Sequence, residues 1–75
     1  MARRNAYAVR YRMWGGDTEH LICVIASSAP EAWDTATYEE IVKKEGKLPY
    51  SAWVSSVTYQ NGNVHYFNTC EGLPY

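Results

Sequence analysis

A chain of 75 residues has room for one domain, and a domain of this size buries only about 60% of its unfolded surface, so its core is thin. The formal net charge is −1, from seven basic and eight acidic side chains, which excludes a strong overall field as the means of attracting partners. Aromatic residues make up 15% of the chain, and such side chains are common in interfaces. A thin core with many aromatic residues favours further burial by self-association.

The chain shows no pattern of export or of membrane insertion. Its longest apolar run, residues 21–26, is far shorter than the roughly 20 residues that a membrane-spanning helix needs. The first residues lack the apolar segment of a signal peptide, and two cysteines are too few for a secreted disulfide framework. We therefore expect a cytoplasmic protein with reduced thiols and no contact with a membrane.

The first third of the chain predicts a β-hairpin. Residues 5–13 alternate between two faces, with tyrosine and valine on one face and alanine and arginine on the other. Gly15 and Gly16 follow as a turn, and residues 19–27 form a second extended run. Both faces of this second run are apolar, which is typical of a strand that is covered on both sides. We therefore expect a cover on each of its faces.

A helix is expected over residues 29–45. Ser28 and Glu31 match a capping box, in which each side chain bonds to the backbone amide of the other residue. Gly46 supplies a left-handed stop. The apolar side chains of the first half share one side of this helix, and those of the second half share a side nearly opposite. The two groups are Ala29, Ala32, Trp33 and Ala36, and then Tyr38, Ile41 and Val42.

This switch of the apolar side has two interpretations. In the first, the helix bends or frays near Glu39, and both groups pack on the chain itself. In the second, only the first group packs on the sheet, and Tyr38, Ile41 and Val42 bind a second copy or a protein target. The second interpretation makes these three residues the candidate partner-binding site and predicts a homo-oligomer.

The last third of the chain predicts a second hairpin, with strands over residues 50–60 and 63–69 around an Asn-Gly dipeptide. Such a dipeptide is typical of a two-residue type I′ loop. That loop places Val57 opposite Tyr66 on the core face and leaves Val54 on the outer face. Together the elements predict an α+β domain of order β-β-α-β-β, with a four-stranded, largely antiparallel sheet and one helix packed on one face.

The polar residues indicate neither catalysis nor metal binding. Two histidines and two cysteines are the right number for zinc, but His20 and Cys23 lie an odd number of residues apart, as do His65 and Cys70. Residues at odd spacing in a strand point to opposite faces. A Cys70 nucleophile with a histidine base is a minor alternative. We expect no enzyme, no cofactor and no metal ion, and we expect Cys23 to be buried.

One group of residues makes nucleic acid the alternative partner. Arg10 and Arg12 share a strand face with Trp14, and Phe67 lies on the last predicted strand. Cations beside stacking rings on an open sheet are how many proteins hold single strands. The alternative function is therefore a single-stranded nucleic-acid-binding protein that uses these four residues. Otherwise the two arginines are solvated strand residues.

Four segments carry a resemblance: an Ala-Tyr-Ala-Val-Arg-Tyr strand, a Ser-Ser-Ala-Pro-Glu-Ala-Trp helix start, a Tyr-Ser-Ala-Trp-Val strand and an Asn-Gly hairpin. With them the chain resembles the small accessory proteins encoded by bacteriophages and prophages. The resemblance implies a non-enzymatic protein of the host cytoplasm that blocks a defence component, such as a CRISPR-type nuclease, or sequesters a nucleotide signal. We therefore expect an interaction or sequestration module that binds a protein target or itself, with a small nucleotide as a further ligand class.

Overall fold

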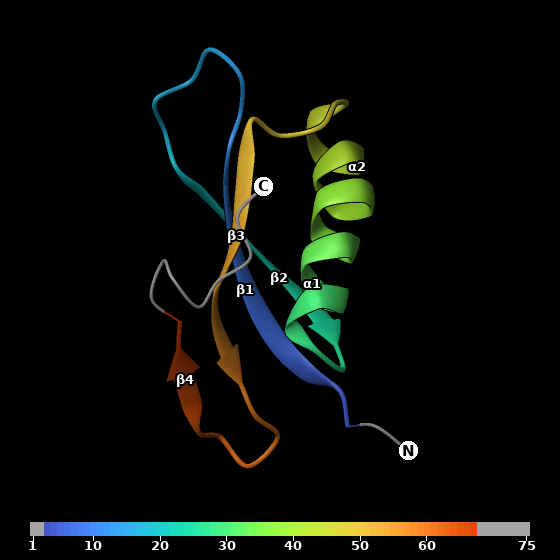
Figure 1. Ribbon diagram of the computed structural model, residues 1–75, viewed down its shortest axis with the longest axis vertical. Coiled ribbons are helices and arrows are strands. Elements are labelled where there is room, and N and C mark those ends of the chain that lie inside the picture. The colour runs from blue at the N-terminus through green and yellow to red at the C-terminus, as the bar shows by residue number, and fades with distance from the viewer. Residues whose placement is uncertain (1–2, 68–75) are drawn as a thin grey trace.

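The computed structural model describes residues 3–67, which form a four-stranded sheet with one helix packed on one face (Figure 1). The elements in chain order are β1 (Asn5–Arg12), β2 (His20–Ala26), α1 (Ala29–Thr35), a π-helical turn η1 (Ala36–Glu40), α2 (Ile41–Glu45), β3 (Ser51–Thr58) and β4 (Val64–Tyr66). The strand order is β2-β1-β3-β4, and all neighbouring strands are antiparallel. The predicted α+β fold is confirmed. Residues 68 and 69 of the predicted fourth strand, and Cys70, lie outside the described residues.

The core lies between the helix and one face of the sheet. The alternation predicted for β1 is confirmed, because its tyrosines and its valine are buried together with apolar side chains of the helix and of two other strands. The core consists of Tyr7, Val9, Tyr11, Val24, Ala26, Ala32, Ala36, Ile41, Ala52, Val54 and Val57. Trp33 Nε1 donates to the carbonyl of Ala52 at 2.9 Å, which fixes the first half of the helix to β3.

Both ends of the helix form where the sequence predicts them. Ser28 Oγ accepts from the amide of Glu31 at 3.3 Å, and Gly46 ends the helix with a φ of 82°. The Glu31 carboxylate accepts a hydrogen bond from the hydroxyl of Ser27 at 2.6 Å instead of from the amide of Ser28. The serine half of the predicted capping box is therefore present, and the glutamate bonds one residue further back.

The π-helical turn explains why the apolar side of the helix switches. The amide of Ile41 donates to the carbonyl of Ala36, five residues earlier, so the middle of the helix accommodates one extra residue. That residue turns Ile41 back to the sheet, where it is fully buried with Ala32 and Ala36. The prediction that Ile41 binds a partner at the surface is wrong, because it relies on regular α-helical spacing.

The second hairpin has a three-residue loop, residues 60–62, instead of the predicted two-residue loop. The amide of Tyr59 donates to the carbonyl of Asn63 at 2.8 Å, and the side chain of Asn61 accepts from the Asn63 amide at 3.0 Å. Gly62 has a φ of 92°, the left-handed conformation that three-residue hairpin loops require.

This loop moves the pairing of β3 and β4 by one position from the predicted register. Val57 faces His65, and Tyr66 faces Ser56. A slip of one residue turns every side chain of a strand to the opposite face. The prediction that Tyr66 lies on the core face is therefore wrong, and Tyr66 points away from the helix.

A second irregularity lies between β1 and β3. The register shifts between Ala8 and Val9, as it does at a β-bulge, so the alternation of β3 changes face along its length. Val54 and Val57 are therefore both buried in the core, although they lie three positions apart in sequence, which in a regular strand would place them on opposite faces. The prediction that Val54 lies on the outer face is wrong, and its neighbour Trp53 takes that place.

Candidate interaction surface

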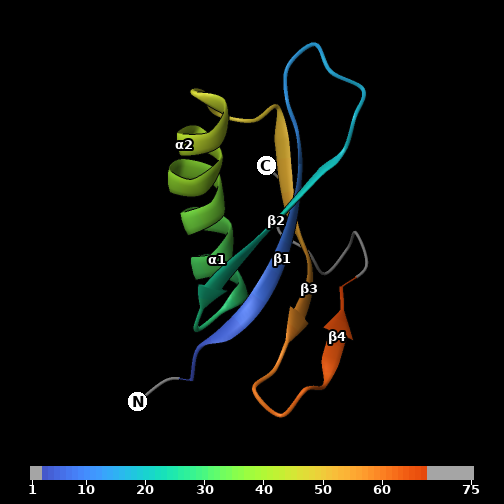
Figure 2. The same cartoon turned by 180° about the vertical axis from the view of Figure 1, so that it is seen from behind.

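The face of the sheet that lies opposite the helix is uncovered within residues 3–67, and we call it the open face. Figures 1 and 2 show the helix on one side of the sheet only. All four strands contribute side chains to this face, as their registers show. They are Ala6, Ala8, Arg10 and Arg12 of β1; Leu21, Cys23 and Ile25 of β2; Ser51, Trp53, Ser56 and Thr58 of β3; and Val64 and Tyr66 of β4.

Strand β2 carries the most apolar part of the open face. Leu21 is 51% exposed and Ile25 is 56% exposed, and Cys23 between them is exposed with a free thiol. The alternate side chains, Ile22 and Val24, pack toward the helix. The predicted second cover of this strand is therefore not found among the described residues. The prediction that Cys23 is buried is wrong, because the helix covers the other face.

The rest of the open face combines small side chains with an exposed ring. Ala6 and Ala8 lie in the middle of the face, on the strand between β2 and β3. At the far edge Tyr66 is 75% exposed. Sequence reasoning missed Leu21 and Ile25 as site residues, although the doubly apolar pattern of their strand was the signal for them. Tyr66 was missed because its face depends on the length of the hairpin loop.

The two arginines of the open face have different surroundings. Arg10 is held by its own chain: Nη1 lies 2.8 Å from Glu19 Oε2, and Nε donates to Ser55 Oγ at 3.3 Å. Arg12 is exposed and forms no ion pair with any described residue. Arg12 is therefore available to an acidic group of a partner, whereas Arg10 would first have to leave Glu19.

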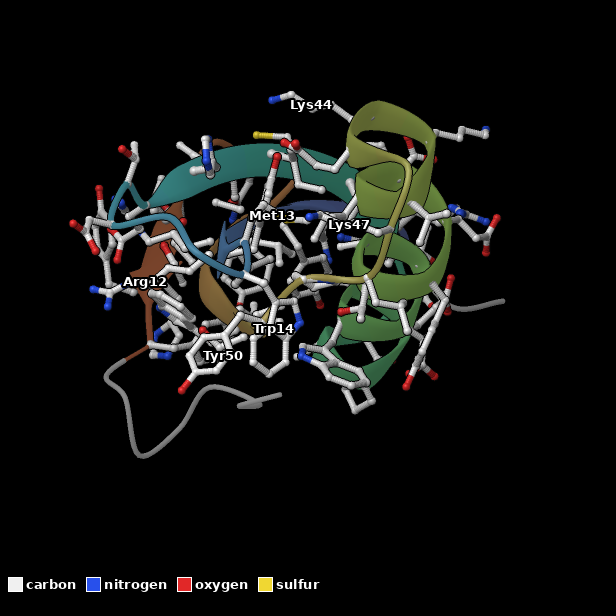
Figure 3. The ribbon with its side chains drawn as sticks, turned by 90° about the horizontal axis from the view of Figure 1, so that it is seen from above. Arg12, Met13, Trp14, Lys44, Lys47 and Tyr50 are labelled. Carbon is white, nitrogen blue, oxygen red and sulfur yellow. The ribbon has the colours of Figure 1, made fainter. Side chains whose placement is uncertain are left out.

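Two exposed rings and several cations gather where the helix ends, and we call this region the aromatic end (Figure 3). The rings of Trp14 and Tyr50, which are 63% and 53% exposed, meet edge to face with centroids 4.6 Å apart. The amide of Tyr50 donates to the carbonyl of Arg12 at 2.7 Å, so the segment before β3 is fixed to the end of β1. Figure 3 shows Arg12, Lys44 and Lys47 at the same end of the molecule.

The four residues predicted to bind nucleic acid do not form one surface. Arg12 and Trp14 lie together at the aromatic end. Arg10 is paired with Glu19, and Phe67 is half-buried and packs against the core. The predicted stacking surface therefore keeps one of its two arginines and one of its two rings.

The three residues predicted to bind a partner do not share a surface. Tyr38 is 52% exposed, and its ring meets that of Trp33 edge to face at 5.8 Å. Val42 is half-buried, and Ile41 belongs to the core. Tyr38 alone of the three presents a large exposed side chain.

Within residues 3–67 no three histidine, cysteine, aspartate or glutamate side chains are grouped as metal ligands. None of the helical segments in this range has the length and hydrophobicity needed to cross a membrane. In comparisons with known proteins, no family model matches the chain, and neither a curated protein nor a solved structure matches it at a significant level.

Proposed function

We propose that this protein is a non-catalytic interaction module that binds a protein partner on the open face of its sheet. The observation that carries this proposal is the exposure of Leu21 and Ile25 on a strand whose alternate side chains, Ile22 and Val24, pack toward the helix. Soluble domains rarely leave contiguous apolar side chains on one face unless that face binds something. Covering these side chains would also give β2 the second layer that its sequence favours.

The composition of the open face favours an acidic, amphipathic protein segment as the partner. Ala6 and Ala8 in the middle of the face allow a partner to approach the sheet closely between the larger side chains of the outer strands. Arg12 at one end of the face can pair with a carboxylate. The partner segment should therefore carry apolar side chains along one side and an aspartate or glutamate near one end.

The resemblance to phage-encoded accessory proteins extends this proposal to the kind of partner. It favours a component of a host cell, such as a nuclease of a defence system, which the protein would inhibit by occupying its surface. Sequestration of a nucleotide signal stays a prediction of the same resemblance.

Selection from a displayed library of random peptides tests the proposal. We expect the immobilised protein to enrich peptides with apolar residues on one side and an acidic residue at one end. Ala8→Glu places a charge in the middle of the open face. It should therefore lower the affinity for the selected peptides at least about tenfold, or 1.4 kcal/mol. Dissociation constants from fluorescence anisotropy measure this change.

Two further variants complete the experiment. Glu39→Lys changes a charge on the exposed side of the helix and should leave peptide affinity unchanged. Arg12→Glu should weaken the peptides that carry an acidic residue. Peptides that bind the Ala8→Glu and Arg12→Glu variants as tightly as they bind the native protein would contradict the proposal.

A second candidate is the binding of single-stranded nucleic acid at the aromatic end, favoured by the exposed rings of Trp14 and Tyr50 at the same end of the molecule as Arg12 and Lys47. Stacking of a base on such a ring contributes about 1–3 kcal/mol. A labelled oligothymidylate should then bind with an affinity that falls steeply with salt concentration and that drops in Trp14→Ala. Absence of binding at low salt would exclude this candidate.

A further inference from the structure

The β2 edge of the sheet is open to a further strand. Among residues 3–67 the one strand paired with β2 is β1, and Figure 3 shows β2 along the border of the sheet. Natural edge strands are usually protected by charged side chains, proline or a bulge. The seven residues of β2 include no lysine, arginine, acid or proline, and its pairing with β1 runs without a bulge. The strand itself therefore lacks the usual protection, and the one charged side chain bonded to its backbone among the described residues is that of Arg4, at the carbonyl of Ile25.

We propose that two copies of this chain pair antiparallel through β2, centred on Cys23, and join their sheets into one. In this register Leu21 faces Ile25 of the second copy on the open face, and Ile22 faces Val24 on the helix side. Cys23 faces its counterpart. All of these pairs are apolar, so the strand is complementary to itself. The dimer goes beyond the proposed function by placing two open faces side by side.

The charges at the ends of this pairing are complementary. One position beyond the strand, Glu19 of one copy comes beside Ser27 of the other. Arg4 already lies along that end of β2, because its Nη2 donates to the carbonyl of Ile25 at 3.1 Å. Arg4 and Glu19 of the second copy are then two strands apart, about 10 Å between Cα atoms. Within its own chain Arg4 lies 3.9 Å from Glu31, and Glu19 lies 2.8 Å from Arg10, so the dimer brings two existing ion pairs near each other. Among the paired residues of β2 itself no lysine, arginine or acidic side chains face each other.

The area needed is small compared with the surface of the molecule. A stable interface buries about 800 Å² on each partner, or roughly one-sixth of the 4924 Å² that this chain exposes. Strand β2 offers apolar side chains on both of its faces, so each new pair buries apolar surface above and below the sheet. A second copy also adds to a core that is thin in a chain of this size.

Cross-linking of single cysteines tests the register. In a Cys23→Ser, Cys70→Ser background, one variant carries Leu21→Cys and a second carries Ile25→Cys. The two new thiols of a mixed dimer lie on opposed residues with Cα atoms about 5 Å apart, within disulfide reach. Two copies of the same variant place their thiols four positions apart, about 13 Å. Copper phenanthroline with oxygen removes one electron and one proton from each thiol as the S–S bond forms.

We expect the mixture to give at least about fivefold more covalent dimer than either variant alone, because only the mixture places thiols within bonding distance. Ala8→Cys in the same background is the control, since residue 8 lies on the open face one strand inside the edge. Equal yields from the mixture and from the single variants would overturn the proposed register. A higher yield from Ala8→Cys would overturn it in favour of packing between two open faces.

Charge exchange tests the pairing by a second measurement. Light scattering of the native chain should give twice its mass of 8.6 kDa. One variant with Leu21→Lys and Ile25→Lys, and another with Leu21→Glu and Ile25→Glu, should each be monomeric because like charges face each other. Their mixture should recover the dimer, which also shows that both variants are folded. A native chain that stays at 8.6 kDa, or a mixture that stays monomeric, would overturn the inference.

The outcome is separable from that of the proposed function. A monomeric native chain whose peptide binding is lost in Ala8→Glu would overturn the dimer and leave the open face as a binding site. If the native chain is a dimer and its selected peptides bind the Ala8→Glu variant with unchanged affinity, the dimer stands and the open face is rejected as the binding site.

Discussion

Tyr11 connects the sheet to the last turn of the helix. Its side chain is fully buried, its hydroxyl donates to Glu45 Oε2 at 2.9 Å, and Lys44 Nζ lies 6.0 Å from the centre of its ring. Burial, and after it the hydrogen bond with Glu45, raises the pKa of Tyr11 to about 12. The folded protein therefore holds this proton more tightly than the unfolded chain does.

Removing the hydroxyl tests this contact. We expect Tyr11→Phe to lower the free energy of unfolding by about 1 kcal/mol at neutral pH. An unfolded tyrosine ionises near pH 10, so the stabilisation is complete below that pH and is lost as the pH rises toward about 12. Urea unfolding of the two proteins at several pH values should show their difference shrinking above pH 10. A difference that stays constant up to pH 12 would contradict the assignment.

Thr37 is the buried polar side chain of the core. It is fully buried, and its Oγ1 has no hydrogen-bond partner among residues 3–67. Replacing that hydroxyl by a methyl group of similar size removes an unpaired polar atom, so Thr37→Val should raise the free energy of unfolding by about 1 kcal/mol. Thr37→Ala is the matched control and should lower it, because it leaves a space. Loss of stability in Thr37→Val would show that the hydroxyl is satisfied.

At the scale of elements, the sequence predicted where each helix and strand begins and ends better than it predicted which face each side chain occupies. Ser28 and Gly46 marked the helix correctly, because caps are local chemistry. The extra residue before Ile41 is not local: it exists because burying that side chain on the sheet outweighs regular helical hydrogen bonding. An Asn-Gly dipeptide is compatible with loops of two and three residues, so the face of Tyr66 could not be read from it.

Changing the length of the π-helical turn tests this account of the helix. Deleting the exposed Glu39 brings Ile41 to four residues after Ala36, which is regular α-helical spacing that keeps it on the sheet. We expect this deletion to change the free energy of unfolding by no more than about 1 kcal/mol. Inserting an alanine after Glu39 instead rotates Ile41 away by about 100° and should cost about 2–5 kcal/mol.

Circular dichroism and urea unfolding measure both variants. If the deletion is as harmful as the insertion, the position of Ile41 does not depend on the turn in the way described.

At the scale of the whole molecule, one face of the sheet is covered and the other is open. The apolar pattern on both faces of β2 predicted that a second cover is needed but gave no sign of what provides it. The candidate residues on the helix could not be judged without the π-helical turn. In the folded chain Ile41 is buried, whereas Leu21 and Ile25 are exposed.

The proposed self-association would make the stability of the molecule depend on its concentration. If folding and pairing through β2 are coupled, the urea midpoint of the native chain should rise with protein concentration, by mass action. The Leu21→Lys, Ile25→Lys variant should have a midpoint that does not move. A native midpoint independent of concentration would contradict coupled folding and pairing.

The shortness of β4 has a consequence for how far such assembly can go. Once two copies have used their β2 strands, each outer border of the joined sheet consists of β4, three residues long, and of the part of β3 before Ser55, which no described residue pairs on that side. A two-fold pairing closes on itself, and a border divided between two short segments offers a poorer template for a third molecule than β2 does. An apolar edge strand such as β2 could start the growth of a fibre if it stayed unpaired. In the proposed dimer it is instead paired within an assembly of two copies.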